Sequence, residues 1–210
     1  MESVQTAVAG MSGLVGCILC TACSVAPIVF TVYLGIYAFN NPDNEAWMGV
    51  VSGEETLFAD KAAAEAASAS DIVDIHNRFV IWFLWGFIQI LAPIGAALLA
   101  GICMLISPAL ANFIGGLVGC AAGCGGLAWW ITGIVWRFRA DGAYACGDFI
   151  PEGKTEEEWL ETITAEGSLF QHQSGKFIAI YYLICWGLMA CNCATALIMS
   201  IVGCIKGKSD

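Results

Sequence analysis

The chain has 210 residues, of which 59% are hydrophobic and only 12% are charged. Because a soluble domain carries about a quarter charged residues, this composition and the mean hydropathy of +0.75 exclude an ordinary water-soluble protein. The net charge of −10 also argues against a nucleic-acid partner, since an acidic surface repels the phosphate backbone.

Long uncharged stretches predict membrane-spanning helices. They lie between Glu2 and Asp43, between Arg78 and Arg137, and between Lys176 and Lys206. One span needs roughly 20 apolar residues, so the first and third stretches each accommodate one helix. The middle stretch accommodates two, separated at Ser107–Asn112, where proline and asparagine interrupt a helix. The four predicted spans are residues 9–39, 79–106, 113–136 and 177–205.

The predicted fold is an all-α membrane protein, a single four-helix transmembrane domain over residues 1–210. Two acidic, partly helical loops, 40–78 and 137–176, lie on the same side of the membrane and form a cap. Each loop carries eight acidic residues. We expect an integral, multi-pass protein with its termini in the cytosol, the usual arrangement of small four-span proteins, while the organelle stays open.

Both loops contain sequence signals for helices. The segment Thr155–Glu158 has the pattern of a capping box, in which each of the two end residues bonds the other's backbone. The alanine-rich segment Lys61–Ser70 has high helix propensity, and a further helix is expected to begin at Asp71.

Aromatic residues concentrate at the loop-side ends of all four spans. These rings are Phe30, Tyr33, Tyr37 and Phe39 in the first span, Phe79, Trp82, Phe83, Trp85 and Phe87 in the second, Trp129, Trp130 and Trp136 in the third, and Phe177, Tyr181, Tyr182 and Trp186 in the fourth. An interfacial aromatic belt explains part of this pattern, but a belt occurs at both membrane faces. We therefore also predict a protomer that is wide at its loop side and bends the membrane when copies pack together.

The opposite halves of the spans are rich in small residues. In the third span, Gly115, Gly119 and Gly123 form a double GxxxG pattern beside Cys120 and Cys124. The second span adds Ala92, Ala96 and Ala100. Helices in lipid associate through close backbone approach at such residues. The pattern predicts a packing face, either within one chain or between copies, and leaves both alternatives open.

The remaining polar and sulfur-containing residues of the spans are interpreted as structural. Ten of the eleven cysteines lie in spans, where they serve as small packing residues rather than as cluster ligands. Gln89 and Asn192 are predicted to bond to each other, because buried polar groups in hydrocarbon need partners. A metal site around His76 and His172 is a weaker alternative, so no catalytic, metal or cofactor site is predicted, bound lipids aside.

The stretch from Trp136 to Phe149, WRFRADGAYACGDF, is interpreted as a membrane exit. Trp136 and Phe138 are expected to anchor at the headgroups, while Arg137 and Arg139 reach lipid phosphates or loop acids. No base lies beside Cys146 in the sequence, so this cysteine is expected to be structural.

This stretch resembles an element of small uncharacterised four-span proteins of ciliates and other protists. The shared residues are Trp136, Arg137, Phe138, Gly142, Cys146, Gly147 and Asp148, together with the segment Ser174–Phe177 that opens the last span. The resemblance implies a membrane location and no known chemistry. The architecture is also similar to that of MARVEL-type four-span proteins.

These observations favour a non-enzymatic protein that organises or curves membranes by homo-oligomeric assembly. Its partners would be copies of itself, lipids or other membrane subunits, and not nucleic acid. One alternative is an accessory subunit of a larger membrane complex, which would dock through the glycine face. Another is a small channel or transporter.

Overall fold

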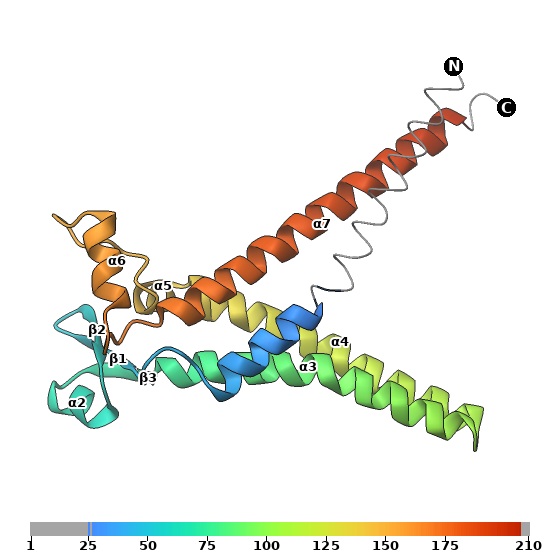
Figure 1. Ribbon diagram of the computed structural model, residues 1–210, viewed down its shortest axis with the longest axis horizontal. Helices are drawn as coiled ribbons and strands as arrows, with labels where there is room; N and C mark the ends of the chain where they lie inside the picture. Colours follow the sequence, from blue (N-terminus) through green and yellow to red (C-terminus); the bar gives the residue numbers. More distant parts are fainter. Residues whose placement is uncertain (1–24, 26, 207–210) are drawn as a thin grey trace. The chain divides into compact units, whose positions relative to one another are not determined.

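The computed structural model describes residue 25 and residues 27–206, and most of these residues are helical (Figure 1). The elements in chain order are a helix Pro27–Phe39, β1 Trp47–Val51, β2 Glu54–Phe58, α2 Lys61–Ala66, β3 Ser70–Asp74, α3 Ile75–Met104, α4 Pro108–Phe138, α5 Ala140–Ala145, α6 Glu156–Thr164 and α7 His172–Lys206. Three helices are long and apolar enough to cross a membrane: α3, α4 and the part His172–Cys191 of α7. The prediction of long apolar helices that could span a membrane is confirmed for these three.

The first predicted span, residues 9–39, is described only at its end, where Pro27–Phe39 is a shorter apolar helix. Its earlier part lies outside the described residues, so the number of four spans stays a prediction. The turn between α3 and α4 lies earlier than predicted, because α4 already begins at Pro108. Proline is tolerated in the first turn of a helix, where its missing N–H has no partner to bond.

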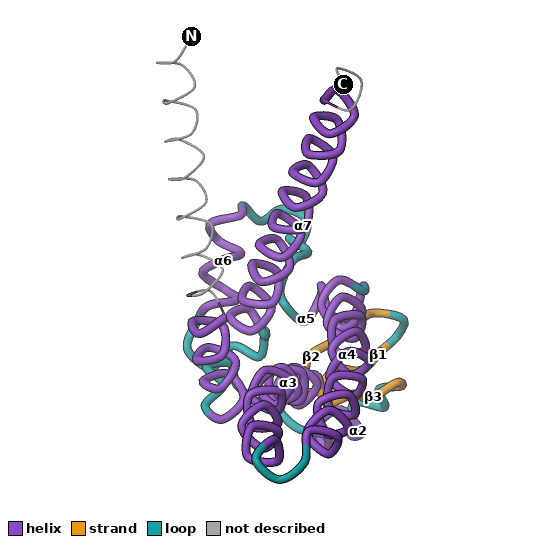
Figure 2. Tube along the Cα trace, turned by 90° about the vertical axis from the view of Figure 1, so that its right-hand side faces the viewer, coloured by secondary structure: helices purple, strands orange, loops and turns teal. Residues whose placement is uncertain are grey.

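The loop 40–78 contains a three-stranded antiparallel sheet, so the all-α prediction was wrong here. The strand order is β2-β1-β3, and Trp47 pairs with Phe58 at one end of the β1–β2 hairpin. Ser52 and Gly53 join these strands with φ angles of 54° and 88°. Two successive positive φ angles match the twist of a two-residue hairpin. Figure 2 shows the three strands in orange.

Two of the three helices predicted in the loops are present, and the one expected to begin at Asp71 is not. The capping box of Thr155 and Glu158 is confirmed at the start of α6. The alanine-rich helix is confirmed as α2, where the Asp60 carboxylate accepts a hydrogen bond from the backbone N–H of Ala63 at 2.7 Å. The helix start predicted at Asp71 was wrong, because Asp71 belongs to β3, which pairs with β1 through Ser70, Val73 and Asp74.

The described residues divide into two compact units: those up to residue 41 together with 77–132 form the first, and residues 42–76 together with 133–206 form the second. In the first unit, α3 and α4 run side by side from a tight turn (Figure 1; Figure 2). Its buried aromatic residues come from the ends of the helices nearest the loops and include Phe79, Trp82 and Phe83, each with no exposed surface.

Trp82 of α3 and Trp129 of α4 form a ring pair between the two helices. Their rings stack with centroids 4.7 Å apart. Each indole N–H donates to the backbone carbonyl of the other residue, at 3.0 Å from Trp82 and 2.8 Å from Trp129. Both polar groups of the pair are therefore satisfied without water, which an apolar environment requires.

Gly86 leaves space for the Trp129 ring, and the substitution Gly86→Ala tests how much the ring pair stabilises the α3–α4 contact. A Cβ atom at position 86 would lie 2.5 Å from Cζ2 of Trp129, whose ring is held by its hydrogen bonds and cannot swing away. Overpacking of this kind costs about 1–3 kcal/mol, so we expect a lower midpoint of thermal unfolding in detergent. Gly101→Ala is the control on the same helix, since no described atom lies within 4 Å of its Cβ position. Equal midpoints for both variants would contradict the proposed role of the ring pair.

Candidate functional site

The small residues of α4 fall into two groups that differ in their surroundings. Gly125 and Gly126 contact α3, because a Cβ atom built at either position would lie 3.0–3.3 Å from the amide of Gln89. The predicted GxxxG residues behave differently. In the described part of the chain, apart from the chain neighbours and the nearby backbone of α4 itself, no atom comes within 4 Å of a Cβ atom built at Gly115, Gly119 or Gly123.

The other predicted packing residues are divided in the same way. Ala96 and Ala100 of α3 are half-buried, whereas Ala92 is exposed. Cys120 and Cys124, beside the glycine row of α4, are exposed. The described contacts of α3 and α4 therefore involve Gln89 and Trp129, and the glycine row lies to one side of them.

Gln89 has a partner inside the α3–α4 pair. Its amide nitrogen donates a hydrogen bond to the backbone carbonyl of Ala122. The side chain of Asn192, its predicted partner, lies outside the described residues, so that pairing stays a prediction. The observed bond ties a polar side chain of α3 to the backbone of α4 in the middle of two apolar helices.

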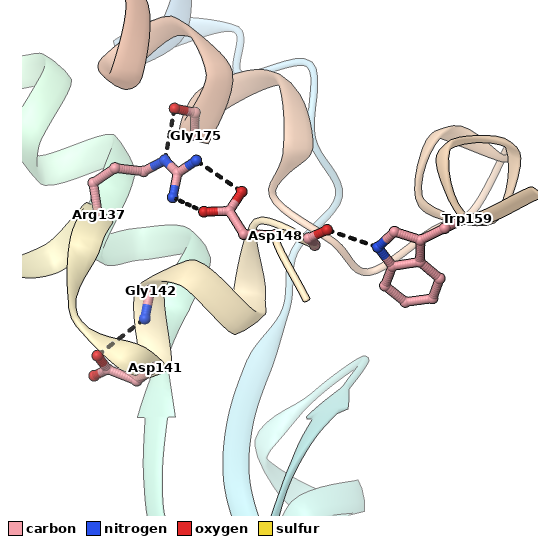
Figure 3. A network of polar contacts seen from close by, with 7 residues as sticks. Arg137, Asp141, Gly142, Asp148, Trp159 and Gly175 are labelled. Carbon is pink, nitrogen blue, oxygen red and sulfur yellow. Dashed lines mark hydrogen bonds and ion pairs between the residues drawn. The ribbon is translucent and has the colours of Figure 1, made fainter. Parts of the chain in front are cut away.

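The second unit holds a network of polar residues centred on Arg137, at the end of α4. The Arg137 side chain is buried, with only 7% of its surface exposed. Its Nη1 and Nη2 donate to the two carboxylate oxygens of Asp148 at 2.5 and 2.9 Å, and its Nε donates to the carbonyl oxygen of Gly175 at 2.8 Å (Figure 3). The bidentate pair joins the end of α4 to the loop after α5, and the bond from Nε joins it to the first turn of α7.

Glycines allow the close approach of the segments around Arg137. A Cβ atom at Gly175 would lie 2.2 Å from the Cys146 sulfur, and one at Gly142 would lie 1.8 Å from the carbonyl oxygen of Trp136. Gly147 has φ +79°, a conformation that favours glycine. Gly142, Gly147 and Gly175 thus serve close packing.

Cys146 is buried beneath this network. Its residue is 2% exposed, and burial raises the pKa of its thiol to about 12, although the nearby Arg137 acts in the opposite direction. A thiol with so high a pKa is a poor nucleophile. The structural role predicted for Cys146 agrees with this environment.

The start of α7 is capped by a residue more than 100 positions away. The two carboxylate oxygens of Asp43 accept hydrogen bonds from the backbone N–H groups of Gln173 and Ser174, at 3.1 and 2.7 Å. A carboxylate at a helix N-terminus satisfies unpaired N–H groups and interacts favourably with the helix dipole. The segment between Pro27–Phe39 and β1 is thereby joined to α7.

Gln171 is the centre of a second set of hydrogen bonds. It has no exposed surface; its backbone N–H donates to the carbonyl oxygen of Ala145 at 2.8 Å, and its Nε2 donates to the carbonyl oxygen of Asn44 at 2.8 Å. Its Oε1 lies 3.1 Å from Nδ1 of His76. Because Gln171 uses its amide nitrogen for Asn44, its oxygen accepts and His76 carries a proton on Nδ1.

Trp159 joins helix α6 to the loop after α5. The indole N–H of Trp159 donates to the carbonyl oxygen of Gly147 at 2.7 Å, and its ring meets the edge of Phe170 with centroids 5.2 Å apart. At the start of the helix, hydrogen bonds from Thr155 lower the pKa of Glu158, which favours the ionised carboxylate of the capping box. A cavity of about 210 Å³ opens between α6 and the loop after α5.

The membrane-exit residues differ in their surroundings. Arg137 meets a loop acid, Asp148, one of its two predicted partners. Arg139 is 70% exposed and lies 3.3 Å from Asp141. Phe138 is exposed, and its ring centroid lies 6.0 Å from that of Tyr182. Their anchoring role at lipid headgroups stays a prediction.

Residues 25 and 27–206 contain no group of three or more His, Cys, Asp or Glu side chains that could hold a metal ion. The structure instead places His76 against Gln171. Asp43 and Gln171 were not predicted, because their partners lie far away in the chain. The pair of Arg137 and Asp148 has a local signal, because both residues belong to the stretch from Trp136 to Phe149.

No protein-family model, curated protein or solved structure matches the chain. The similarity to protist four-span proteins and to the MARVEL architecture therefore stays an expectation.

Replacement of Arg137 tests the polar network. Arg137→Gln removes the bidentate pair and leaves the Asp148 carboxylate without its main partner. Breaking a buried pair costs about 3–5 kcal/mol, but Asp148 is 42% exposed, so we expect a loss of about 2 kcal/mol. The measurement is thermal unfolding in detergent, followed by tryptophan emission. Arg139→Gln is the control and should change stability by less than about 1 kcal/mol, since this pair is largely exposed.

Cys146 offers a test based on pH. Its folded-state pKa of about 12 exceeds the ordinary value near 9, so the folded thiol keeps its proton where the unfolded thiol has lost it. Stability from this group is therefore complete below pH 9 and declines as the pH rises toward 12. At pH 9, only about one thousandth of the folded thiol is ionised. We expect peptide mass mapping to find Cys146 unalkylated in the native protein and alkylated after denaturation; native labelling at pH 8 would contradict its burial.

Proposed function

We propose that the protein is a non-enzymatic, four-span membrane protein that organises or curves membranes by assembling with copies of itself. The observation that carries this proposal is the row of Gly115, Gly119 and Gly123. Outside the nearby backbone of α4, no described atom lies within 4 Å of a Cβ atom built at these glycines. At the neighbouring Gly125 and Gly126, the side chain of Gln89 fills that space. Small residues on a lipid-facing helix favour close association with another helix.

The exposure of the long helices supports a place in the bilayer. In the most apolar 18-residue stretch of α3 no residue is buried, and in that of α4 only 6% are. Large side chains such as Leu98, Ile102 and Leu117 are more than 60% exposed. In water so much contiguous apolar surface would drive aggregation, whereas lipid solvates it without penalty.

The polar residues of the second unit favour a structural role over catalysis. Arg137, Asp148 and Gln171 use their polar atoms for hydrogen bonds within the chain. The buried Cys146 is protonated at neutral pH. These contacts hold segments of the two loops together. The loops would then form a rigid cap that keeps neighbouring copies in a fixed orientation.

Gly119→Leu tests the assembly. A leucine side chain on the glycine row prevents the close approach of a second helix. We therefore expect the dissociation constant of the oligomer to rise at least tenfold, which corresponds to about 1.4 kcal/mol. The matched control is Ala121→Leu: Ala121 is also exposed, and two positions along a helix point to the opposite side. Mass measurement of the purified chain in detergent gives the number of copies, and imaging of densely reconstituted vesicles gives the curvature.

The outcomes separate the alternatives. A wild type that stays monomeric, or equal effects of the two leucine variants, would overturn self-assembly through this row. Foreign subunits that copurify would favour an accessory subunit of a larger complex. Flat vesicles formed by an oligomeric wild type would remove the curvature while keeping the assembly.

A further inference from the structure

The turn between α3 and α4 is apolar and exposed. It consists of Leu105, Ile106 and Ser107, and the first two of these residues are 88% and 78% exposed. Turns that face water are built mainly from Gly, Pro, Asn, Asp and Ser. No charged residue lies between Arg78 and Arg137, so the whole hairpin lacks the charges that usually mark a water-facing loop.

The backbone of this turn is bonded internally. The N–H groups of Leu105, Ile106 and Ser107 donate to carbonyl oxygens in the last turn of α3 at 3.1, 3.0 and 2.8 Å. The next residue, Pro108, has no N–H group, and the carbonyl oxygen of Ser107 accepts from the N–H group of Ala111 at 3.1 Å. Backbone donors inside a bilayer must be satisfied within the protein, and the donors of this turn meet that requirement.

The lengths of the helices determine how deep the turn lies. Helices α3 and α4 have 30 and 31 residues, so each is about 45 Å long at 1.5 Å per residue. If both cross the bilayer, as the proposed function requires, Arg78 and Arg137 mark the headgroups on the loop side. A bilayer with its headgroups is about 40–45 Å thick, and an average tilt of about 20° shortens the reach of a helix. The turn then ends among the lipids of the opposite leaflet.

We infer that the α3–α4 turn stays among the phospholipids of the leaflet opposite the loops, with Leu105 and Ile106 against acyl chains. The inference rests on the proposed membrane function, because only a bilayer places lipid at this end of the hairpin. Large side chains favour lipid over a second copy as the occupant, since helices in membranes associate through small residues. The protein then presents no water-facing loop between α3 and α4 to which a soluble partner could bind.

Photocrosslinking of the full chain in phosphatidylcholine vesicles tests this contact. Leu105 is replaced by p-benzoyl-phenylalanine, which inserts into neighbouring C–H bonds on illumination, and mass spectrometry identifies the adducts. We expect at least fivefold more phosphatidylcholine adduct at position 105 than at the control position Glu152, which is exposed in the loop after α5.

A second label reports contact with water. Leu105 and Glu152 are each replaced by p-azido-phenylalanine, and a sulfonated cyclooctyne is introduced on both sides of the membrane by freezing and thawing. We expect at least fivefold less labelling at position 105 than at position 152, and equal labelling of both after denaturation.

The outcomes distinguish this inference from the proposed function. Equal aqueous labelling at the two positions in a chain that resists carbonate washing would overturn the inference alone. Adducts that join two chains at position 105, in place of lipid adducts, would also overturn it, because the turn would then contact a second copy. A chain that carbonate washing removes from the vesicles would overturn both the inference and the proposed membrane function.

Discussion

The burial of one guanidinium group, that of Arg137, is the constraint on which the second unit depends. Removing such a charge from water is costly unless ionic and hydrogen-bonding partners compensate. Asp148 supplies both carboxylate oxygens and Gly175 a carbonyl oxygen, so Nε, Nη1 and Nη2 all have acceptors. Because those acceptors belong to different segments, satisfying the charge also determines where the loop after α5 and the start of α7 must lie.

The same logic extends outward from that pair. The start of α7 needs acceptors for its first N–H groups, and Asp43 provides them. The segment that carries Asp43 continues to Asn44, whose carbonyl oxygen accepts from Gln171 and whose Nδ2 donates to the carbonyl oxygen of Ser168 at 2.9 Å. These bonds satisfy polar groups of two long loops within the unit. The first unit follows a different rule, in which ring stacking and the reciprocal bonds of Trp82 and Trp129 hold apolar helices together.

The apolar helices could be predicted because their signal is local. A run of about twenty uncharged, apolar residues is typical of a membrane-spanning helix. This signal predicts α3 and α4 without any knowledge of the residues that contact them. The capping box at Thr155 is equally local. The sheet was missed because composition drew attention to alanine-rich helix formers, while the Ser52–Gly53 turn between two short runs carries the hairpin signal.

The polar network was harder to predict for a different reason. Asp43 and Ser174 are separated by 131 positions, and no sequence spacing reveals that one caps the other. Gln171 resembles an ordinary loop residue until the fold surrounds it with Asn44, Ala145 and His76. Contacts between residues so far apart in the chain are set by the tertiary structure. A single sequence shows directly only the pairs whose members are close in the chain.

The charge of the chain also bears on how copies could assemble. Its net charge of −10 lies entirely in the loops 40–78 and 137–176, while the spans are uncharged. Like-charged surfaces repel within the Debye length, about 8 Å at physiological ionic strength. In the proposed assembly, attraction between glycine rows would therefore act in the membrane, and repulsion would act between caps. These opposing forces favour copies that tilt apart on the loop side, so charge and ring size would bend a membrane in the same direction.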